Sequence, residues 1–332
     1  MKWIVGLDVG GTKCAVVLAQ AGREIRIRAR AAFPTRAERP FAEIQAELFG
    51  AVRQVLREEG VSPAQVSAIG VSCGGPLNSR RGVVLCPPNL PTWVDIPIVE
   101  LLQDTFGAPA YLLNDAKACA LVEWKLGAGR GTNNMIFLTM GTGMGSGIIA
   151  EGRLVSGACD MGGEIGHMRI EPDGPVGFGK HGSFSGFTSG GGIGRLASAL
   201  ALQALEQGAP YAFARDRQTA SSLTAKRLAD AAAAGDRDAR RIFALVGEKL
   251  GKGVALLIDA LNPEAVIIGS IFVRCEALLR PSMEQVLERE CIPYSLAACR
   301  VLPAQTGEQL GDLASIMTAL YGAGMEMPDR LA

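Results

Sequence analysis

The feature that most constrains the fold is a short pattern that occurs twice, one domain length apart. "VGLDVGGTKCAVVLA" occupies residues 5–19 and "IFLTMGTGMGSGIIA" occupies residues 136–150. Each runs from an apolar strand through a glycine-rich turn into a second apolar strand, and Gly10 in the first corresponds to Gly141 in the second. Because 332 residues suffice for roughly two domains, we predict one such hairpin in each domain.

Both turns have the composition of an anion-binding turn. Glycine has no Cβ and adopts positive φ, so its backbone N–H groups can approach a phosphate closely. Two ordinary β-hairpins are the alternative, although "GTGMGSG" is longer than the two-residue turn that closes a hairpin. Other phosphate motifs are absent: the sequence contains no GxxxxGK[ST], no GxGxxG after a strand and no protein-kinase signature.

Apolar periodicity along the rest of the chain indicates an α/β protein with mixed sheets. Strands are expected at residues 3–8, 13–19, 24–32, 67–72 and 265–270, and near residue 300. Helices are expected from residue 41, after residue 115, and at 194–206, 224–233 and 238–260. The stretch 157–194 is dense in glycine and has little periodicity.

Composition excludes several classes of partner. Lys and Arg total 33, Asp and Glu total 33, and no basic run occurs, so we expect no nucleic-acid partner. No apolar run reaches the length of about 20 residues that a membrane span needs, so we expect no membrane partner. The eight cysteines include no CxxC pair, which favours buried thiols in a reducing cytoplasm. We also expect the mature chain to begin at Met1.

Asp115 is a candidate general base. It follows an apolar strand and precedes a helix, where Asp and Asn also serve as N-caps. A carboxylate at a strand end, close to two phosphate turns, suits the deprotonation of an attacking hydroxyl. The sequence leaves both roles open.

Four further polar residues are candidates for ligand binding. Asp8 in the first strand suits Mg²⁺ held through water. Asn89, Glu164 and His167 lie in loops that also carry Trp or Gly, which suits sugar hydroxyls. Ordinary loop turns would explain Asn89 equally well, and a satisfied buried histidine would explain His167.

Together these residues resemble the ROK family, which groups bacterial sugar kinases and repressors of the actin-like ATPase superfamily. The resemblance extends from "GLDVGGT" through "GVSCGGPL", "PPNLPTW", "LLNDAKACALVEW", "MGTGMGSGII" and "GGEIGH" to "LNPEAVIIGS". It implies a two-lobed fold with an RNase-H-like sheet in each lobe and the active site in the cleft between lobes. The implied lobes are residues 1–115, with a C-terminal helix at 308–325 packed back on them, and residues 116–307.

The resemblance also implies roles for individual residues. Asp115 would be the catalytic base, and Asp8 would orient Mg²⁺. Residues implied to bind ATP are Asp8, Gly10, Gly11, Thr12, Lys13, Gly141, Thr142, Gly143, Gly145 and Gly269. Residues implied to bind the sugar are Gly75, Asn89, Asn114, Asp115, Glu164, His167 and Ser185. Relatives are commonly dimers or tetramers, so we expect a homo-oligomer.

The sequence departs from the family at one motif. Many members carry CxCGxxGCxE after GEIGH, and its cysteines bind structural zinc together with that histidine. Here Val176, Phe178 and Ser183 stand at the cysteine positions and Ser185 stands at the glutamate position. A closed zinc site needs four N or S ligands, so we predict no structural zinc, and the choice of sugar is left open.

Three functions are therefore weighed. The first is ATP-dependent phosphorylation of a glucose-like hexose or an N-acetylhexosamine. The second is a sugar-sensing regulator, which in this family carries an N-terminal winged helix; the first strand begins at Trp3, which leaves no residues for one. The third is a catalytically silent sugar-binding protein. Retention of Asp8, both glycine turns and Asp115 favours the kinase.

Overall fold

The computed structural model describes residues 1–331. The chain forms two compact units. The first comprises Met1–Thr132, Gly147–Gly162 and the chain from Gln305 onward, and the second comprises Asn133–Ser146 and Gly163–Ala304. Residues 116–132 and 147–162 thus group with the N-terminal unit, although the expected boundary fell after residue 115. The expected lobes, 1–115 with 308–325 and 116–307, stay a prediction.

The first sheet has six strands in the order β13-β3-β2-β1-β4-β7. Strands β1, β2 and β3 form an antiparallel meander, and β4 and β7 extend it in parallel. The short strand β13 pairs in parallel with β3. The bounds are β1 Lys2–Val9, β2 Lys13–Ala21, β3 Glu24–Pro34, β4 Val66–Cys73, β7 Ala110–Asn114 and β13 Arg330–Leu331.

The second sheet repeats this plan with five strands in the order β10-β9-β8-β11-β12. Strand β10 is antiparallel to β9, and β11 is parallel to both β8 and β12. Each sheet therefore places a glycine-turned hairpin, β1–β2 or β8–β9, beside a parallel strand, which explains the repeated sequence. The bounds are β8 Met135–Met140, β9 Met144–Ala150, β10 Arg153–Leu154, β11 Ala265–Ser270 and β12 Arg300–Pro303. The α/β class with mixed sheets is confirmed.

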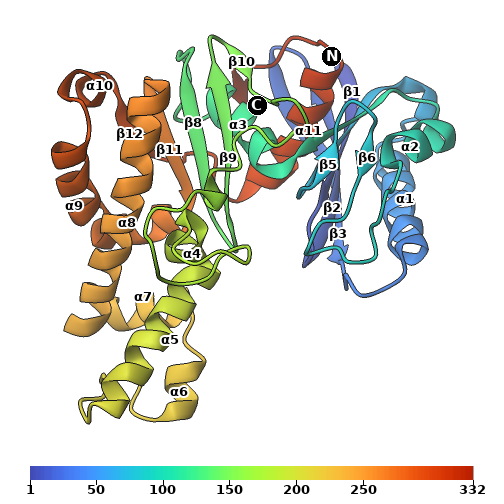
Figure 1. Ribbon diagram of the computed structural model, residues 1–332. Coiled ribbons are helices and arrows are strands. Elements are labelled where there is room, and N and C mark those ends of the chain that lie inside the picture. Colours follow the sequence, from blue (N-terminus) through green and yellow to red (C-terminus); the bar gives the residue numbers. More distant parts are fainter. Residues whose placement is uncertain (332) are drawn as a thin grey trace. The chain divides into compact units, whose positions relative to one another are not determined.

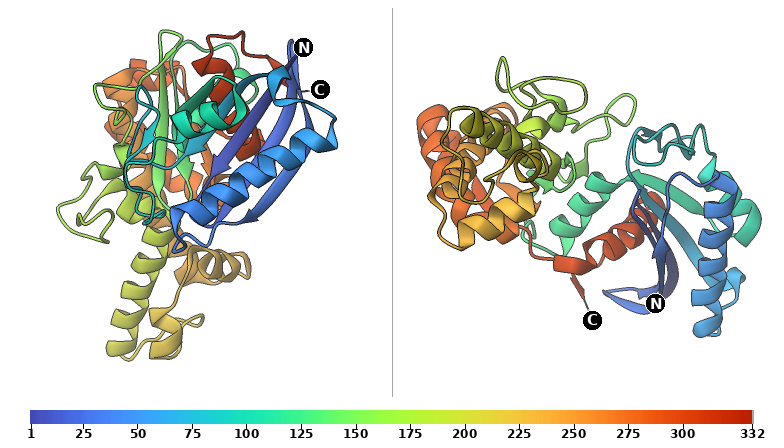
Figure 2. Two further views of the ribbon diagram at one scale, coloured as in Figure 1. Left: turned by 90° about the vertical axis from the view of Figure 1, so that its right-hand side faces the viewer. Right: turned by 90° about the horizontal axis from the view of Figure 1, so that it is seen from below.

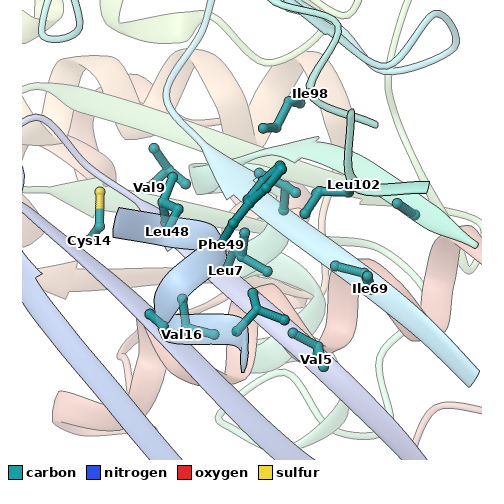
Figure 3. Packing of buried hydrophobic residues seen from close by; sticks show 14 of the residues in the cluster. Val5, Leu7, Val9, Cys14, Val16, Leu48, Phe49, Ile69, Ile98 and Leu102 are labelled. Carbon is teal, nitrogen blue, oxygen red and sulfur yellow. The ribbon is translucent and has the colours of Figure 1, made fainter. Parts of the chain in front are cut away.

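Helix α1, Phe41–Glu58, covers one face of the first sheet through an apolar stripe (Figure 1). Its residues Ile44, Leu48, Val52 and Val55 are fully buried at helical spacing. They pack with Val5, Leu7 and Val9, alternate residues of β1 whose side chains share one face (Figure 3). Burial of this stripe removes the apolar surface of both elements from water.

Helix α11, Leu310–Gly322, packs on β1 and β4. A Cβ on Gly6 would lie 2.9 Å from Ser315 Cβ, and one on Gly70 would lie 2.4 Å from the backbone N of Ala319. Glycine at these two positions therefore allows the helix backbone to reach the sheet directly. The close approach brings the first turn of α11 against the carboxyl end of β1.

The remaining elements of the first unit are short. Strands β5 and β6 form a small antiparallel ribbon that precedes α2, and α3 follows β7 directly. The bounds are β5 Leu77–Asn78, β6 Val83–Val84, α2 Ile98–Phe106, α3 Asp115–Lys125, and the 3-10 helices Pro63–Gln65 and Gly307–Gln309.

The helices of the second unit include one long pair, α8 and α9, that packs side by side (Figure 2). Helix α5 begins at Gly190, four residues before the sequence predicted it, because glycine weakens the periodic signal although Ser189 caps the helix. The bounds are α4 Phe184–Thr188, α5 Gly190–Glu206, α6 Arg217–Ser221, α7 Ala225–Ala233, α8 Arg237–Leu261, α9 Ile271–Glu290, α10 Pro293–Ala298, and the 3-10 helix Ile165–His167.

All eight cysteines are free; four are buried, but Cys86 and Cys159 are exposed because they lie in loops. The prediction of buried thiols therefore applies to four of the eight cysteines, and Cys119 and Cys299 are partly buried. No helix within residues 1–331 has the length and hydropathy of a membrane span.

We predict that Gly70→Ala destabilises the protein while Gly50→Ala does not. The new methyl group at residue 70 would overlap the backbone of α11, which costs about 3 kcal/mol of unfolding free energy. Gly50 lies in α1 with no neighbour within 4 Å of a built Cβ, so alanine there should add about 1 kcal/mol through helix propensity. Denaturant unfolding of both variants measures the difference, and equal midpoints would contradict the close approach.

Candidate functional site

In the first unit, Asp115 stands at the first position of α3 and Asn114 is the N-cap. The Asn114 Oδ1 accepts hydrogen bonds from the backbone N–H groups of Ala116 and Lys117 at 3.1 and 3.2 Å. The Asp115 Oδ1 accepts one from Ala116 N at 2.8 Å, and Oδ2 receives no bond from residues 1–331. Since Asn114 takes the capping role, one Asp115 oxygen is available to a ligand.

Three loop residues, Gly74, Gly75 and Asn89, lie close to Asn114 and Asp115. A Cβ on Gly74 would lie 3.6 Å from both side-chain polar atoms of Asn89 and 4.0 Å from Asp115 Oδ2. A Cβ on Gly75 would lie 3.4 Å from Asn114 Nδ2, which the helix cap leaves free to donate. Gly75, Asn89, Asn114 and Asp115, four of the residues expected to bind the sugar, therefore lie together.

The first glycine turn is adjacent to the same loop. A Cβ on Gly11 would lie 2.4 Å from the carbonyl oxygen of Asn89, so only glycine fits there. Gly10 N donates to Lys13 O at 3.1 Å, while the N–H groups of Gly11 and Thr12 meet no acceptor within residues 1–331. The Thr12 and Lys13 side chains are exposed. Two backbone donors thus remain for an anion.

Thr35 supports this turn and was not expected from the sequence. Its buried hydroxyl donates to Gly10 O at 2.6 Å, and its N–H donates to Thr12 O at 3.0 Å. The Cys14 thiol lies 3.3 Å from the same hydroxyl. Because Thr35 is 25 residues from Gly10, no local motif could have identified it.

Asp8 and Asp115 are electrostatically linked. Burial, followed by the negative charges of Asp115 and Asp312, raises the pKa of Asp8 to about 6, while Lys13 and Arg30 oppose this rise. The pKa of Asp115 is also raised, chiefly by desolvation, and the hydrogen bond from the backbone N–H of Ala116 opposes this rise. The pKa of a carboxylate rises when its charged form loses hydration or faces like charge.

Lys117 is a second supporting residue that the sequence did not reveal. Its buried ammonium donates to the carbonyl oxygens of Ser156 and Asp160 at 3.3 and 2.7 Å. The Asp160 carboxylate accepts hydrogen bonds from Ser79 N and Oγ, both at 2.8 Å. This set ties the first turn of α3 to two loops and thereby restrains the surroundings of Asp115.

In the second unit, the second glycine turn also offers free donors. Gly141 N donates to Gly143 O at 3.0 Å, and Met144 N donates to the Ser185 hydroxyl at 3.2 Å. The N–H groups of Thr142 and Gly143 have no acceptor in the described part of the chain. Gly145 lies in β9 immediately after this turn.

The N-terminus of α5 meets this turn. Gly190 N donates to Gly141 O at 2.8 Å, and the Ser189 hydroxyl caps the helix by accepting from Gly192 N at 3.1 Å. A Cβ on Gly191 would lie 3.2 Å from the guanidinium of Arg195. A helix N-terminus, a cation and glycine N–H groups together suit a phosphate. The signal in the sequence was "SGGG", a capping serine followed by glycines.

Ser270 joins the same group. It follows Gly269 at the end of β11 with φ 60° and ψ −112°, a combination that glycine adopts far more readily than serine. Its hydroxyl would lie 3.9 Å from a Cβ on Gly141. Ser270 therefore lies beside the second turn, next to Gly269 in sequence. Binding of a nucleotide by Gly269 stays a prediction.

The other expected sugar-binding residues of the second unit differ in accessibility. His167 is exposed in the 3-10 helix that Glu164 precedes. Ser185 is 3% exposed, and its hydroxyl already accepts the bond from Met144 N. The Ser185 hydroxyl therefore stabilises the second turn through this hydrogen bond. Contact between Ser185 and a sugar stays a prediction.

The segment without cysteines folds through other contacts. Glu171 accepts ion-pair hydrogen bonds from Lys249 and Lys252 of α8, both at 2.6 Å. These interactions lower the pKa of the Glu171 carboxyl. Within residues 1–331 no group of three or more His, Cys, Asp or Glu side chains is arranged to hold a metal ion. The absence of structural zinc stays a prediction.

Comparison with known proteins decides the family. Residues 4–319 match the ROK family along nearly the whole chain. The chain belongs to the ROK family. A glucokinase of Halalkalibacterium halodurans is 32% identical over 93% of this chain and 92% of its own length. A xylose repressor of Caldicellulosiruptor bescii is 29% identical over 80% of this chain and 65% of its own length.

A solved ROK structure agrees with the fold. The glucokinase of Streptomyces griseus, crystallised in complex with glucose and AMPPNP, is 29% identical and superposes with a TM-score of 0.75. The match covers 96% of this chain and all of that one. The two-lobed ROK fold predicted from the sequence is therefore confirmed, and the family contains both kinases and repressors.

We predict that Ser270→Gly stabilises this ROK protein by about 1 kcal/mol, because glycine adopts the local backbone angles without strain. Ser222→Gly serves as the control, since Ser222 has an ordinary φ of −118° and glycine there should lower stability. Thermal and denaturant unfolding measure both variants. A loss of stability in Ser270→Gly would contradict the strained geometry.

We also predict that Asp8→Asn stabilises the metal-free protein above pH 6 but not below pH 4. A raised pKa means that the folded protein favours the neutral carboxyl. Wild-type stability therefore decreases as pH rises from 3.8, the pKa of this carboxyl in the unfolded chain, through about 6, its pKa in the folded protein. Removal of the charge should recover about 3 kcal/mol at pH 8. Urea unfolding with a chelator tests this, and Asp104→Asn, which alters an exposed carboxylate on α2, is the control. A gain that is constant with pH would contradict the assignment.

Proposed function

We propose that this protein is a sugar kinase that transfers the γ-phosphoryl group of ATP to a hydroxyl of a hexose or an N-acetylhexosamine. The observation that carries the proposal is the free Oδ2 of Asp115, held beside Asn89 and Gly74 while Asn114 caps α3. A carboxylate oxygen that makes no hydrogen bond to the helix N-terminus can accept a proton from an alcohol.

In this proposal the first unit binds and activates the sugar. The Asn114 Nδ2 and the Asn89 amide have the polarity to bind neighbouring hydroxyls and orient the reacting one toward Asp115. The raised pKa of Asp115 brings its basicity closer to neutral pH, which makes it a better proton acceptor than an ordinary aspartate. His167 and Glu164 of the second unit complete the proposed set of sugar ligands.

The two glycine turns are proposed to bind the phosphates of ATP. Gly11 and Thr12 of the first turn, and Thr142 and Gly143 of the second, have free N–H donors. Lys13, Arg195 and the N-terminus of α5 supply positive charge or potential. Because phosphoryl transfer has a loose transition state, positioning and charge neutralisation supply most of the rate.

Asp8 fits the proposed Mg²⁺. Burial and the negative charges of Asp115 and Asp312 disfavour the ionised form of its carboxyl group. A nearby cation would offset the repulsion between these carboxylates. One carboxylate with several waters is a coordination that Mg²⁺ favours. When bound, Mg²⁺ would neutralise charge on the phosphates.

The relatives support this function without deciding the sugar. A kinase relative matches over 93% of the chain, whereas the xylose repressor matches over 80%. A sugar-sensing regulator and a silent sugar-binding protein remain the alternatives, and a homo-oligomer remains our expectation from the family.

The test is ADP release from Mg²⁺-ATP across a panel of hexoses and N-acetylhexosamines. We expect one or more sugars to stimulate ADP release and Asp115→Asn to reduce kcat by about 10² to 10⁴-fold, because the general base is lost. The wild-type rate should rise with pH with a midpoint above 3.8, since the base must be deprotonated and its pKa is raised. Asp104→Asn is the matched control and should retain activity.

Two results would contradict the proposal. If no sugar stimulates ADP release while calorimetry detects sugar binding, the protein is a sensor or a silent binder. If Asp115→Asn keeps the wild-type kcat, the protein is a kinase with a different base.

A further inference from the structure

The segment between His167 and Ser185 contains an aromatic residue in an unfavourable backbone conformation. Phe178 has φ 52°, in the left-handed region that favours glycine. Its two neighbours in sequence are glycines, but Phe178 itself is not. Its side chain is 52% exposed. A bulky residue in this region is strained, and a half-exposed ring gains little from burial. Stability therefore gives no reason for phenylalanine at this position.

The ring of Phe178 stacks on the imidazole of His167. The ring centroids lie 4.2 Å apart, and the planes are inclined by 17°. Neither imidazole nitrogen has a hydrogen-bond partner among the residues that the structure describes. The stack thus covers a face of the imidazole while the two nitrogens keep their capacity for hydrogen bonds.

The surrounding turn holds this stack in place. Gly177 and Lys180 exchange two backbone hydrogen bonds of 3.0 Å, which closes the turn that carries Phe178. The Lys180 ammonium donates to His167 O at 2.7 Å, so the same turn also holds the histidine backbone. Both partners of the stack are therefore positioned by one short loop.

The stack also lies beside the second glycine turn. Phe178 Cζ would be 3.6 Å from a Cβ on Gly143. Gly143 carries one of the free N–H groups of that turn. Phe178 therefore connects the imidazole of His167 with the backbone proposed to bind phosphate.

We propose that Phe178 is a positioning residue for sugar binding, which fixes the imidazole of His167 by stacking so that its nitrogens meet a sugar hydroxyl beside the turn at Gly143. This inference rests on the proposed function, in which His167 binds the sugar. A side chain held in its binding orientation loses less freedom when the ligand arrives, so the benefit appears in sugar affinity.

Phe178→Gly is the decisive variant, because glycine adopts φ 52° without strain and the fold should keep or gain stability. We expect the KM for the sugar to rise about 5-fold, with kcat and the KM for ATP nearly unchanged, since stacking of this kind has a modest energy. Phe178→Tyr should restore the wild-type KM, whereas Phe178→Leu should not. Arg36→Gly, which relieves a similar φ of 48° in the first unit, is the control and should leave the sugar KM unchanged.

Histidine resonances give a readout that does not depend on activity. His167 and His181 are the two histidines of the chain, and His181→Gln assigns their signals. In the wild type the ring current of Phe178 should shift the His167 ring protons upfield. Phe178→Gly and Phe178→Leu should abolish that shift, and Phe178→Tyr should keep it. Added sugar should perturb the His167 signals at lower concentration in the wild type than in Phe178→Gly.

Each outcome decides the inference. Identical His167 signals in the wild type and Phe178→Gly would show that the stack is absent in solution and overturn it. A ring-current shift with an unchanged sugar KM would also overturn it, because the ring would then be only structural. If the wild type releases no ADP with any sugar, the kinase proposal fails; the sugar titration of His167 then supports or overturns the positioning role separately.

Discussion

The direct packing of α11 on β1 and β4 is the constraint on which the first unit depends. Gly6 and Gly70 bring the helix backbone to the sheet, and the same approach places Gly311 against the Asp8 carboxylate. Asp312 in the first turn of α11 pairs with Arg30 of β3 at 2.7 Å and adds negative charge near Asp8. A helix about 300 residues further along the chain therefore sets the electrostatics at the end of β1.

The two sheets share one order of strands, and each has a glycine turn at the same place in that order. In both, a meander of three strands is extended by two parallel strands, and a glycine turn joins the first two strands. Each turn receives support from a residue outside the hairpin: Thr35 bonds to Gly10, and Ser185 bonds to Met144. Support from distant side chains keeps the N–H groups of a flexible glycine turn available to a ligand.

Sequence patterns predicted the local structure around the candidate site well. The strands, both glycine turns and Asp115 at the start of α3 followed from residue order, because strand periodicity and glycine position act over a few residues. The ROK family was indicated by the resemblance of motifs spread along the chain, and the family match confirms it. The missed residues act over long separations: Lys117 reaches Ser156, Asp160 reaches Ser79, and Glu123 accepts the N–H groups of Gln305 and Thr306. No window of the sequence contains both members of such a pair.

By itself the sequence determined the main strands and helices, the repeated hairpin and the candidate carboxylates, since these depend on side-chain type and spacing along the chain. Only the tertiary structure decided that Asn114 rather than Asp115 caps α3, that Ser185 is already bonded to Met144, and that Phe178 stacks on His167. The physical reason is that a hydrogen bond or a ring contact requires two groups at a defined distance and orientation, and folding alone brings those groups together.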